Sequence, residues 1–479
     1  MTVAAGRHEL VVVTSRIPAD ALAAGRRPSR WTGEHAALAG ALQPALMARD
    51  GAWIGWHGRA DMHMAPVVLQ SVLLSPVSLS AADIADHIDG QCASTIAPLY
   101  HDGLGGPAFH RRWRQAYRSV NERYAAAAAE LAASGATVLV HGHELQLVPG
   151  MLRSVRPDLT IGFVLPLPLP PVELFRRMPM RADIVSGILG SDVIFVQDRR
   201  SADNLLRLAV GAGSTVTGAG AIAVGSRRVA VEVLPMGAET QSVEHLAAGA
   251  NVRRRLDSLR RELRVPGTVL LSIDPLDGTS GAERRLAAFA ELLHDGTLRA
   301  EECALIQVVV PAARESAELA ELRSRVEQLA ARINGSHGSV GRPVVHHLHR
   351  SLDTLDTVAL FRLADVFLAT ALRDGGNPTA KAFVSARIDN TGALVLSEFS
   401  ATAAELPQAT LVNPYDLEDL KSAVMAAVAP ADPAAARAAM SRMRLAVRDH
   451  DVRWWAGRVL AALDTARAGT TAVVVPGGA

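Results

Sequence analysis

A loop rich in Gly, Ser and Thr near the middle of the chain has the composition of a phosphate-binding segment. It lies at the end of the stretch 272–281, which follows a short apolar run and leads into a helical pattern. At a helix N-terminus, such a loop offers backbone N–H groups to a phosphate. An ordinary turn has the same composition, so both interpretations stay open. The candidate residues are Thr279, Ser280 and Gly281.

A second loop, 372–381, also follows an apolar run. Its Gly-Gly-Asn sequence stands directly before Pro378, and this order favours a helix that begins with proline in its first position. Asp374 lies just before that helix start, where its carboxylate could accept hydrogen bonds from the hydroxyl groups of a ligand. It could equally pair with Arg373 or cap the loop. The candidate binding residues here are Asp374, Gly375, Gly376, Asn377 and Thr379.

Arginines follow apolar runs in both halves of the chain. Arg16 comes at the end of the first run, and Arg314 comes after the run 304–310. A guanidinium group at a strand end suits a phosphate or carboxylate, while a surface ion pair is an equally good interpretation. Trp53, in the segment 51–56, could stack on a sugar ring, although tryptophans at this spacing are more often core residues.

Two histidine clusters, at 141–144 and 346–349, have the side chains of a metal site without its spacing. Neither shows the helical i, i+4 pair with a partner motif that zinc sites use. Each follows or overlaps an apolar run, so the end of a strand is the simpler location. Cys92 and Cys303 stand far apart and form neither a metal-ligand spacing nor a disulfide framework. We therefore predict a protein without a metal or a bound cofactor.

The bulk composition narrows the class of protein. Hydrophobic residues make up 49% of the 479 residues, enough for a large core, and the net charge is +1. This charge gives no electrostatic reason to expect a nucleic acid or an anionic membrane as partner. The sequence shows no signal-peptide h-region and no apolar run near the ~20 residues of a membrane span. We expect a cytoplasmic protein with reduced cysteines, and a homo-oligomer is an open question.

Short apolar runs, bounded by turn or polar residues, recur along the chain. Their length and their apolar character on both faces are typical of parallel strands covered by helices on each side. Helical patterns separate many of them, most clearly at 109–133 and 315–333. This alternation predicts α/β domains with doubly wound sheets. The predicted strands are 10–13, 137–140, 160–165, 192–196, 229–234, 269–273, 304–310, 366–369 and 393–396.

The pattern divides into two halves. The first ends near residue 237, a polar helical stretch follows, and a new strand begins at Val269. We predict an N-terminal domain over 1–237, a C-terminal domain over 238–450, and a last helix and tail over 451–479, the helix returning to the first domain. Ligands of open α/β sheets bind at the carboxyl ends of the strands, so a cleft between the two domains is the expected site.

Taken in order, these segments resemble the trehalose-6-phosphate synthases, retaining glycosyltransferases that join glucose from UDP-glucose to glucose 6-phosphate. The most specific match is the loop 372–381, LRDGGNPTAK, which is similar to the L-R-D-G-M-N-L-V-A-K of that family. The resemblance extends from Leu10 to about Leu463. Further matching segments are 51–56, 332–335, 393–399, 404–406 and 411–416.

The resemblance implies a GT-B architecture, in which two Rossmann-like domains face each other across a cleft, and a reaction without a metal. A nucleoside diphosphate sugar would be the donor and a sugar phosphate the acceptor. Asp374 would hold the donor sugar, with Asn377 in the adjacent loop. Arg16, Trp53 and Arg314 match positions that the family uses around the acceptor phosphate. Asp374 and Arg314 are accordingly the predicted catalytic residues.

Several positions depart from the pattern of the family. Gly33 and His141 match the starts of its early Gly-Gly loop and of its H-D-Y-H-L motif, and both are predicted to bind substrate. The Asp of that second motif is Gly142 here. The donor loop of the family, R-L-D-Y-x-K-G, binds the diphosphate through its Arg and Lys, and here it is PLDGTSG. The H-I-P-F-P motif is PLPLP, and the ribose-binding Glu is Ala382.

These departures lead to three hypotheses. The main one is a diverged glycosyltransferase or pseudo-glycosyltransferase of secondary metabolism, which transfers a sugar or cyclitol from a nucleoside diphosphate donor to a sugar or sugar-phosphate acceptor. The first alternative is a trehalose-6-phosphate synthase with rearranged contacts. The second is a non-catalytic sugar-phosphate sensor. Two charge-assisted bonds to a phosphate, each worth roughly 1.5–3 kcal/mol, are lost, which favours the main hypothesis over the first alternative.

Overall fold

The computed structural model describes residues 8–104, 106–218, 220–263, 267–311 and 316–471. The chain separates into two compact units: unit 1 comprises Met1–Met236 and Val452–Ala479, and unit 2 comprises Gly237–Asp451. Each unit is an α/β body built on one sheet. The expected cleft between the two units stays a prediction.

Unit 1 is built on a ten-stranded sheet in the order β3-β4-β2-β1-β5-β6-β7-β10-β9-β8. The pairs from β4 through to β10 are parallel, whereas β3 pairs with β4, and β9 with β10 and β8, in antiparallel fashion. The sheet therefore has the parallel centre that the apolar runs predict, with antiparallel strands at its edges. The strands are β1 (His8–Arg16), β2 (Ala52–Trp56), β3 (Val67–Leu69), β4 (Val72–Val77), β5 (Ala132–His141), β6 (Thr160–Val164), β7 (Val193–Val196), β8 (Thr215–Val216), β9 (Ile222–Val224) and β10 (Arg227–Val233).

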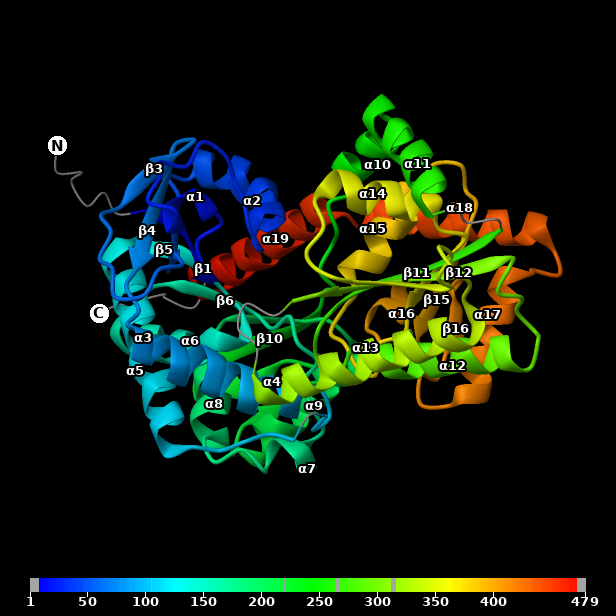
Figure 1. The fold of residues 1–479 in the computed structure, drawn as a ribbon. Helices are drawn as coiled ribbons and strands as arrows, with labels where there is room; N and C mark the ends of the chain where they lie inside the picture. Colours follow the sequence, from blue (N-terminus) through cyan, green and yellow to red (C-terminus); the bar gives the residue numbers. More distant parts are fainter. Residues whose placement is uncertain (1–7, 105, 219, 264–266, 312–315, 472–479) are drawn as a thin grey trace, which may run out of the picture. The chain divides into compact units, whose positions relative to one another are not determined.

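Helices cover both faces of this sheet (Figure 1). Alternate residues of β1 point to opposite faces, so Leu10 and Val12 join one core cluster while Val11 and Val13 join the other. The first face is covered by α1 (Asp20–Ala23), α2 (Ala36–Ala48) and α19 (Val452–Thr471). The second face is covered by the π-helix η1 (Ile84–Ile96), α4 (Ala97–Tyr100), α5 (Arg111–Leu131), the 3₁₀ helix η2 (His143–Leu145), α6 (Val148–Val155), α7 (Val172–Phe175), α8 (Arg181–Ile188) and α9 (Arg199–Gly211). The short helix α3 (Ala81–Asp83), which has no buried residue, precedes η1.

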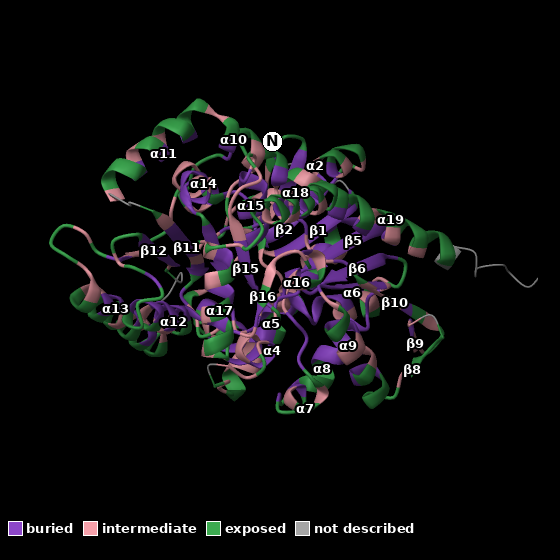
Figure 2. Ribbon diagram, turned by 90° about the vertical axis from the view of Figure 1, so that its right-hand side faces the viewer, coloured by how far each residue is buried: buried purple, intermediate pink, exposed green. Residues whose placement is uncertain are grey.

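Unit 2 is built on a six-stranded, entirely parallel sheet in the order β13-β12-β11-β14-β15-β16. Leu270 and Leu271 of β11 point to opposite faces and into separate core clusters. Its inner strands are largely buried, its edge strands β13 and β16 are partly exposed, and the outer faces of its helices are exposed (Figure 2). The strands are β11 (Thr268–Pro275), β12 (Cys303–Val310), β13 (Val345–His349), β14 (Val366–Ala369), β15 (Ala393–Ser397) and β16 (Thr410–Val412).

The helices of unit 2 form a layer on each face of its sheet. The clusters of apolar side chains on the two faces assign each helix to its layer. One layer holds α10 (Thr240–Ala248), α11 (Ala250–Leu263), α14 (Thr354–Leu363), α15 (Pro378–Ala386), α16 (Thr402–Glu405) and α18 (Pro433–Asp449), and the other holds α12 (Ala282–His294), α13 (Ala317–His337) and α17 (Leu417–Val428).

All nine predicted strands are present, and the predicted helices at 109–133 and 315–333 correspond to α5 and α13. The structure adds strands that the apolar runs did not predict. Among these, β8 and β9 have two and three residues, too few for a periodic signal. The sequence of β13, VHHLH, has three histidines, which its position at the edge of the sheet tolerates.

The last helix, α19, packs against α2, β6 and β7 of unit 1. Trp455 is fully buried there, and its Nε1–H donates to Leu234 O over 3.2 Å, whereas Trp454 is 38% exposed. A bidentate pair between Arg49 and Asp464, at 3.0 and 2.7 Å, joins the end of α2 to α19. Of the helices in the described ranges, none combines the length and the apolar character that a membrane crossing requires.

Candidate functional site

The two predicted loops of unit 2 lie side by side. The first follows β11, which ends at Pro275, and the second follows β14. The backbone N–H of Leu372 in the second loop donates to Thr279 O in the first over 2.7 Å. Gly281 has φ +71°, and a Cβ there would clash with Thr370 O. Glycine is therefore required at 281 both for its left-handed backbone and for the close approach of the second loop.

The first loop is held by its own side chains. The Asp277 carboxylate accepts hydrogen bonds from Thr279 N at 2.9 Å and Thr279 Oγ1 at 2.8 Å, and Ser280 Oγ donates to Asp277 O over 3.1 Å. Gly281 is the N-cap of α12 and has no side chain to occupy the first-turn N–H groups, which stay available to an anion. Thr279, Ser280 and Gly281 thus lie at a helix N-terminus, and phosphate binding there stays a prediction.

Arg285 of α12 is buried beside this loop. Its guanidinium pairs with the Asp274 carboxylate and donates to Ser280 O over 2.7 Å. Burial raises the pKa of Asp274 to about 6; the charge of Arg285 opposes this rise, and the carboxylates of Asp277 and Asp374 add to it. Arg285 is therefore committed to holding the loop in place. The loop 275–281 itself contains no basic residue.

Asp374 is partly exposed and caps the second loop. Its Oδ1 accepts hydrogen bonds from Gly376 N at 3.1 Å and Ser400 Oγ at 2.5 Å, and its Oδ2 accepts one from Asn377 Nδ2 at 3.3 Å. Loop capping, one of the two interpretations from the sequence, is thus observed. The two carboxylate oxygens together have capacity for a further acceptor contact with a hydroxyl group. Apart from its chain neighbours, no described residue comes within 4 Å of the place where a Cβ would stand at Gly376, so the described part of the chain leaves the loop open there.

The helix predicted after this loop is α15, and it begins at Pro378 as predicted. Asn377 is its N-cap: the side-chain oxygen accepts a hydrogen bond from a backbone N–H of α15 at 2.8 Å, and the side-chain nitrogen donates to Asp374. Both ends of this amide are occupied, which favours a structural role over the predicted ligand contact. Gly375 lies in the loop and Thr379 in the first turn of α15.

In unit 1, the structure brings two of the predicted residues together around Asp20. Arg16 ends β1, and its Nη2 lies 3.9 Å from Asp20 Oδ1. Gly33 has φ +86°, and a Cβ there would clash with the Asp20 carboxylate. The Arg16 guanidinium also lies 5.7 Å from the centre of the Trp56 ring. The Arg16–Asp20 pair is half-exposed, so the guanidinium is open to a ligand. The surface ion pair that the sequence also allowed is present as well.

His141 is the last residue of β5, as the strand-end interpretation predicts. Its ring lies edge-on to His35, with the ring centres 5.4 Å apart, and neither ring nitrogen has a hydrogen-bond partner within the described part of the chain. Burial, together with the nearby His35, lowers the pKa of His141 to about 3. Gly142 follows with φ +115°, and a Cβ there would clash with the Glu144 carboxylate. That carboxylate therefore occupies the space beside position 142.

Two further predicted residues have different outcomes. Trp53 is fully buried in the core, where its Nε1–H donates to Thr14 Oγ1 over 2.8 Å. Its ring therefore has no surface for a ligand, and the core interpretation describes its position. Arg314 lies outside the described residues, so its predicted role stays a prediction.

Two residues of the candidate site were not named from the sequence. Arg285 lies within a helical pattern with nothing to mark it as buried. Glu144 was considered only as part of a histidine cluster, and its proximity to position 142 depends on the positive φ of Gly142. The sequence does hold a signal for Glu144: Gly142 replaces the Asp of the family, and Glu144 supplies a new carboxylate two residues later.

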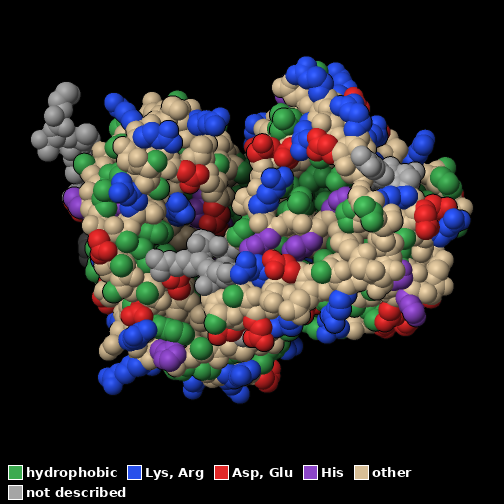
Figure 3. Space-filling model, viewed as in Figure 1, with side chains coloured by type: hydrophobic (Ala, Val, Ile, Leu, Met, Phe, Trp, Pro, Cys, Tyr) green, Lys and Arg blue, Asp and Glu red, His purple; other side chains and the backbone are tan. Residues whose placement is uncertain are grey.

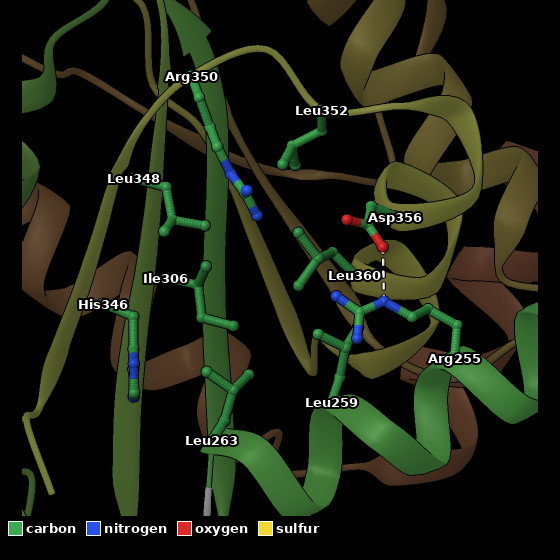
Figure 4. Close-up of a pocket in the computed structure, with 10 residues that line it drawn as sticks. All are labelled: Arg255, Leu259, Leu263, Ile306, His346, Leu348, Arg350, Leu352, Asp356 and Leu360. Carbon is green, nitrogen blue, oxygen red and sulfur yellow. Dashed lines mark hydrogen bonds and ion pairs between the residues drawn. The ribbon is translucent and has the colours of Figure 1, made fainter. Parts of the chain in front are cut away.

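A cavity of about 80 Å³ lies in unit 2 between α11, β12, β13 and α14 (Figure 4). Its walls are mainly Leu and Ile side chains, and Arg350 points inward from the end of β13. At one side, Arg255 Nε donates to Asp356 Oδ1 over 2.5 Å. On the face shown in Figure 3, basic side chains gather over α11, the helix that carries Arg255. No lining residue of the cavity comes from the loops 275–281 or 372–381, so it is separate from the predicted site.

Comparison with known proteins identifies the family. Residues 8–465 match glycosyltransferase family 20. The chain is 41% identical over 475 residues to the trehalose-6-phosphate synthase of Mycobacterium bovis, across 96% of this chain and 95% of that protein. It is 42% identical over 480 residues to the trehalose-6-phosphate synthase of Mycobacterium sp. strain KMS, across 98% of both chains.

Solved structures agree with this result. The chain is similar to an α,α-trehalose 6-phosphate synthase from Burkholderia multivorans, with a TM-score of 0.90 and 27% identity over 99% of both chains. It is also similar to a UDP-forming α,α-trehalose-phosphate synthase from Burkholderia xenovorans, with a TM-score of 0.87 and 27% identity over 96% of this chain and 99% of that one. The two parallel-sheet units are those of the GT-B fold. The chain belongs to glycosyltransferase family 20.

Proposed function

We propose that the protein is a retaining glycosyltransferase that forms trehalose 6-phosphate from UDP-glucose and glucose 6-phosphate. The observation that carries this proposal is the 41% identity, over 475 residues, to a trehalose-6-phosphate synthase. One similar structure is described as UDP-forming, and one from E. coli as bound with UDP-2-fluoro glucose. These likenesses favour the ordinary synthase, the first alternative drawn from the sequence, over a diverged enzyme of secondary metabolism.

In this proposal unit 2 binds the donor. Asp374 accepts hydrogen bonds from hydroxyl groups of the donor sugar, and the N–H groups that begin α12 face its phosphates. The anomeric carbon leaves its phosphate as an oxocarbenium-like species, and the acceptor hydroxyl attacks from the same face. The leaving phosphate takes the proton of that hydroxyl. The reaction then requires no protein nucleophile, so the residues serve to position and to stabilise charge.

Unit 1 binds the acceptor in this proposal. Arg16, Gly33 and His141 lie at or beside the carboxyl ends of β1 and β5, which are adjacent strands. Arg16 pairs with the acceptor phosphate, and the role predicted for Arg314, outside the described residues, stays a prediction. Glu144 supplies the carboxylate that position 142 lacks, because its side chain fills the space beside that glycine.

A second candidate is a glycosyltransferase of the same family that uses another donor. The observation that favours it is the charge of the donor-side loop, where Asp277 stands without a basic neighbour in 275–281 and Arg285 is already paired with Asp274. A nucleoside diphosphate there receives hydrogen bonds from backbone amides alone. UDP-glucose would then bind weakly, and the base or the donated group would decide which donor is used.

A product assay tests both candidates. The purified chain is incubated with glucose 6-phosphate and, in separate reactions, with UDP-, GDP-, ADP- and dTDP-glucose, and mass spectrometry quantifies the phosphorylated disaccharide and the nucleoside diphosphate. Proton NMR of the dephosphorylated disaccharide reads the anomeric configuration. We expect α,α-trehalose from UDP-glucose, since retention keeps the α configuration of the donor.

Each outcome decides between the candidates. Product from UDP-glucose above that from the other donors supports the first candidate. Product from another donor alone contradicts it and supports the second. Absence of product with every donor contradicts both candidate transferase functions. The non-catalytic sugar-phosphate sensor is then the hypothesis to test.

A further inference from the structure

A cavity of about 210 Å³ in unit 1 lies apart from the residues predicted to bind the acceptor. It is formed by η1, the start of α5 and the turn before α8, on the second face of the sheet. In both views of the fold, α5, α7 and α8 lie on the opposite side of unit 1 from α2 (Figures 1 and 2). Arg16, Gly33 and His141 are not among its lining residues.

One residue that lines this cavity carries a buried amide. Gln91, which is 3% exposed, lines the cavity from η1, and no hydrogen bond joins its side chain to any residue in the described ranges. The hydroxyl of Thr95, beside it, already donates to Ala108 O. The amide lines the cavity, where a ligand or water can complete its hydrogen bonds. A π-helix such as η1 is rare and commonly marks a functional site.

Two arginines form one wall of the cavity. Arg111 and Arg114 are three residues apart in the first turn of α5, so they share one face of the helix. In the part of the chain that the structure describes, neither pairs with a carboxylate, whereas Arg112 and Arg118 of the same helix each have one at 3.1 Å. The N-cap of α5 makes no side-chain hydrogen bond, which leaves first-turn N–H groups for an anion.

We propose that this cavity binds a small phosphate monoester. Arg111, Arg114 and the first N–H groups of α5 hold the phosphate, and Gln91 contacts a hydroxyl group of the ligand. Phe109, 40% exposed, and buried Met180 cover its apolar side. The cavity is smaller than the roughly 300–1,000 Å³ of sites for drug-sized ligands, which favours a small ligand over a nucleoside diphosphate sugar. None of the residues proposed to bind the donor or the acceptor lines this cavity, so the site is additional to theirs.

Calorimetric titration tests this proposal with two probes, glycerol 3-phosphate and inorganic phosphate, and with glycerol as the uncharged comparison. We expect both phosphates to bind and glycerol not to bind. Tighter binding of glycerol 3-phosphate identifies a phosphate ester as the occupant, and equal binding identifies free phosphate. The double variant Arg111→Gln/Arg114→Gln is expected to weaken both by about tenfold or more, because each charge-assisted hydrogen bond contributes strongly.

The matched control is Arg118→Gln, which removes the same charge from the same helix outside the cavity. It is expected to change the dissociation constant by less than about twofold. Gln91→Met, which keeps the side-chain length, is expected to weaken glycerol 3-phosphate more than inorganic phosphate. Equal weakening by the double variant and by Arg118→Gln, or no binding up to on the order of 10 mM phosphate, overturns the proposal.

This test is independent of the proposed function. The double variant is expected to keep the rate of glycosyl transfer, since neither arginine belongs to the proposed donor or acceptor site. If no transfer is found, the titration still decides whether the cavity binds a phosphate.

Discussion

The donor-side loop shows how a few residues set the charge that a ligand meets. Asp274 and Arg285 form a buried pair, and the carboxylates of Asp277 and Asp374 act on the same site. Arg285 is a structural cation, since its guanidinium is buried and held by several partners. The loop is thus held in place by polar contacts within the protein, while 275–281 contains no cation for a diphosphate.

Restoring a cation to this loop is expected to strengthen donor binding. Pro275 is exposed at the end of β11, so Pro275→Arg adds a guanidinium without entering the core. We expect UDP to bind about tenfold more tightly or better, because a charge-assisted hydrogen bond to a phosphate is worth roughly 1.5–3 kcal/mol. Calorimetric titration with UDP measures the change. Thr297→Arg, in an exposed turn of unit 2, is the control, and an equal gain there would contradict a diphosphate site at 275–281.

Asp374 is expected to be required for transfer. Asp374→Asn keeps a side-chain oxygen for Gly376 N and Ser400 Oγ, so the loop should stay folded. Removing the charge beside the donor sugar is expected to lower kcat/KM on the order of 100-fold, as for a misplaced reacting group. Asp353→Asn, at the N-cap of α14, is the matched control and should retain activity. If Asp374→Asn has an unchanged kcat/KM, Asp374 does not act on the donor sugar and only caps the loop.

The buried histidines of unit 1 predict a loss of stability in mild acid. Burial lowers the pKa of His141 to about 3 and of His87 to about 4. Histidine in the unfolded chain titrates near 6.5. Between the lowered pKa of the folded protein and about pH 6.5, the unfolded chain therefore binds more protons than the folded one. Stability is present above pH 6.5 and falls as the pH drops, by about 1.4 kcal/mol per pH unit for each fully shifted histidine.

Urea unfolding at pH 7.0 and pH 5.5 measures this loss, and tryptophan fluorescence reports unit 1 because all six tryptophans belong to it. His141→Gln is expected to reduce the difference between the two pH values by about 1 kcal/mol. His63→Gln, at an exposed position, should leave the difference unchanged. If His141→Gln and His63→Gln show the same stability difference between the two pH values, the burial of His141 does not cause the loss.

At the scale of residues, the sequence predicted locations better than roles. The Gly-rich loop, the Asp374 loop and the strand-end positions of Arg16 and His141 were found, because strand ends and helix starts have local signals. The burial of Trp53 and the double occupation of the Asn377 amide depend on tertiary contacts, which spacing does not reveal. For the same reason Arg285 and Glu144 were missed.

At the scale of elements, long apolar runs were reliable and irregular segments were not. Each of the nine runs corresponds to a strand, and most of these strands are apolar because both of their faces are buried. The exception is β10, which is largely half-buried and includes Glu232. The edge strand β13 was not among the nine predicted strands, although a strand end was the expected location of its histidines; its place at the edge of the sheet tolerates them. The π-helix η1 was not predicted either, although Ile84, Ile88, Cys92 and Ile96 recur in it every four residues. The junction of α12 with the loop after β14 depends on Gly281, where two elements meet at backbone distance.

This junction can be tested with two glycines of similar backbone conformation. Gly281 and Gly296 have φ +71° and +74°, but only at Gly281 does a Cβ clash with another segment. Gly296→Ala should therefore cost only the backbone strain, about 1 kcal/mol, while Gly281→Ala should cost a further 1–3 kcal/mol from the clash with the second loop. Urea unfolding followed by circular dichroism measures both. Equal losses would mean that the loops separate at no cost.

At the scale of the whole molecule, unit 1 is made from two segments of the chain that the whole of unit 2 separates. The first segment leaves one face of its sheet incomplete, and α19 covers part of it with Trp455, Val459 and Leu463. Contacts between residues so distant in sequence form late and slow the folding of the unit. The apolar side chains of this face are therefore fully buried only when α19 packs against unit 1, as predicted for the last helix.

The adjacent tryptophans of α19 provide a matched test of this dependence. Trp455 is fully buried and donates a hydrogen bond to Leu234 O, whereas Trp454 is 38% exposed. Trp455→Ala is expected to destabilise unit 1 by about 3–5 kcal/mol through the cavity it leaves, and Trp454→Ala by less than about 1 kcal/mol. Urea unfolding followed by the remaining tryptophan fluorescence measures both values. If Trp455→Ala unfolds at the same urea concentration as Trp454→Ala, unit 1 does not depend on its C-terminal helix, and the first segment must bury its own sheet.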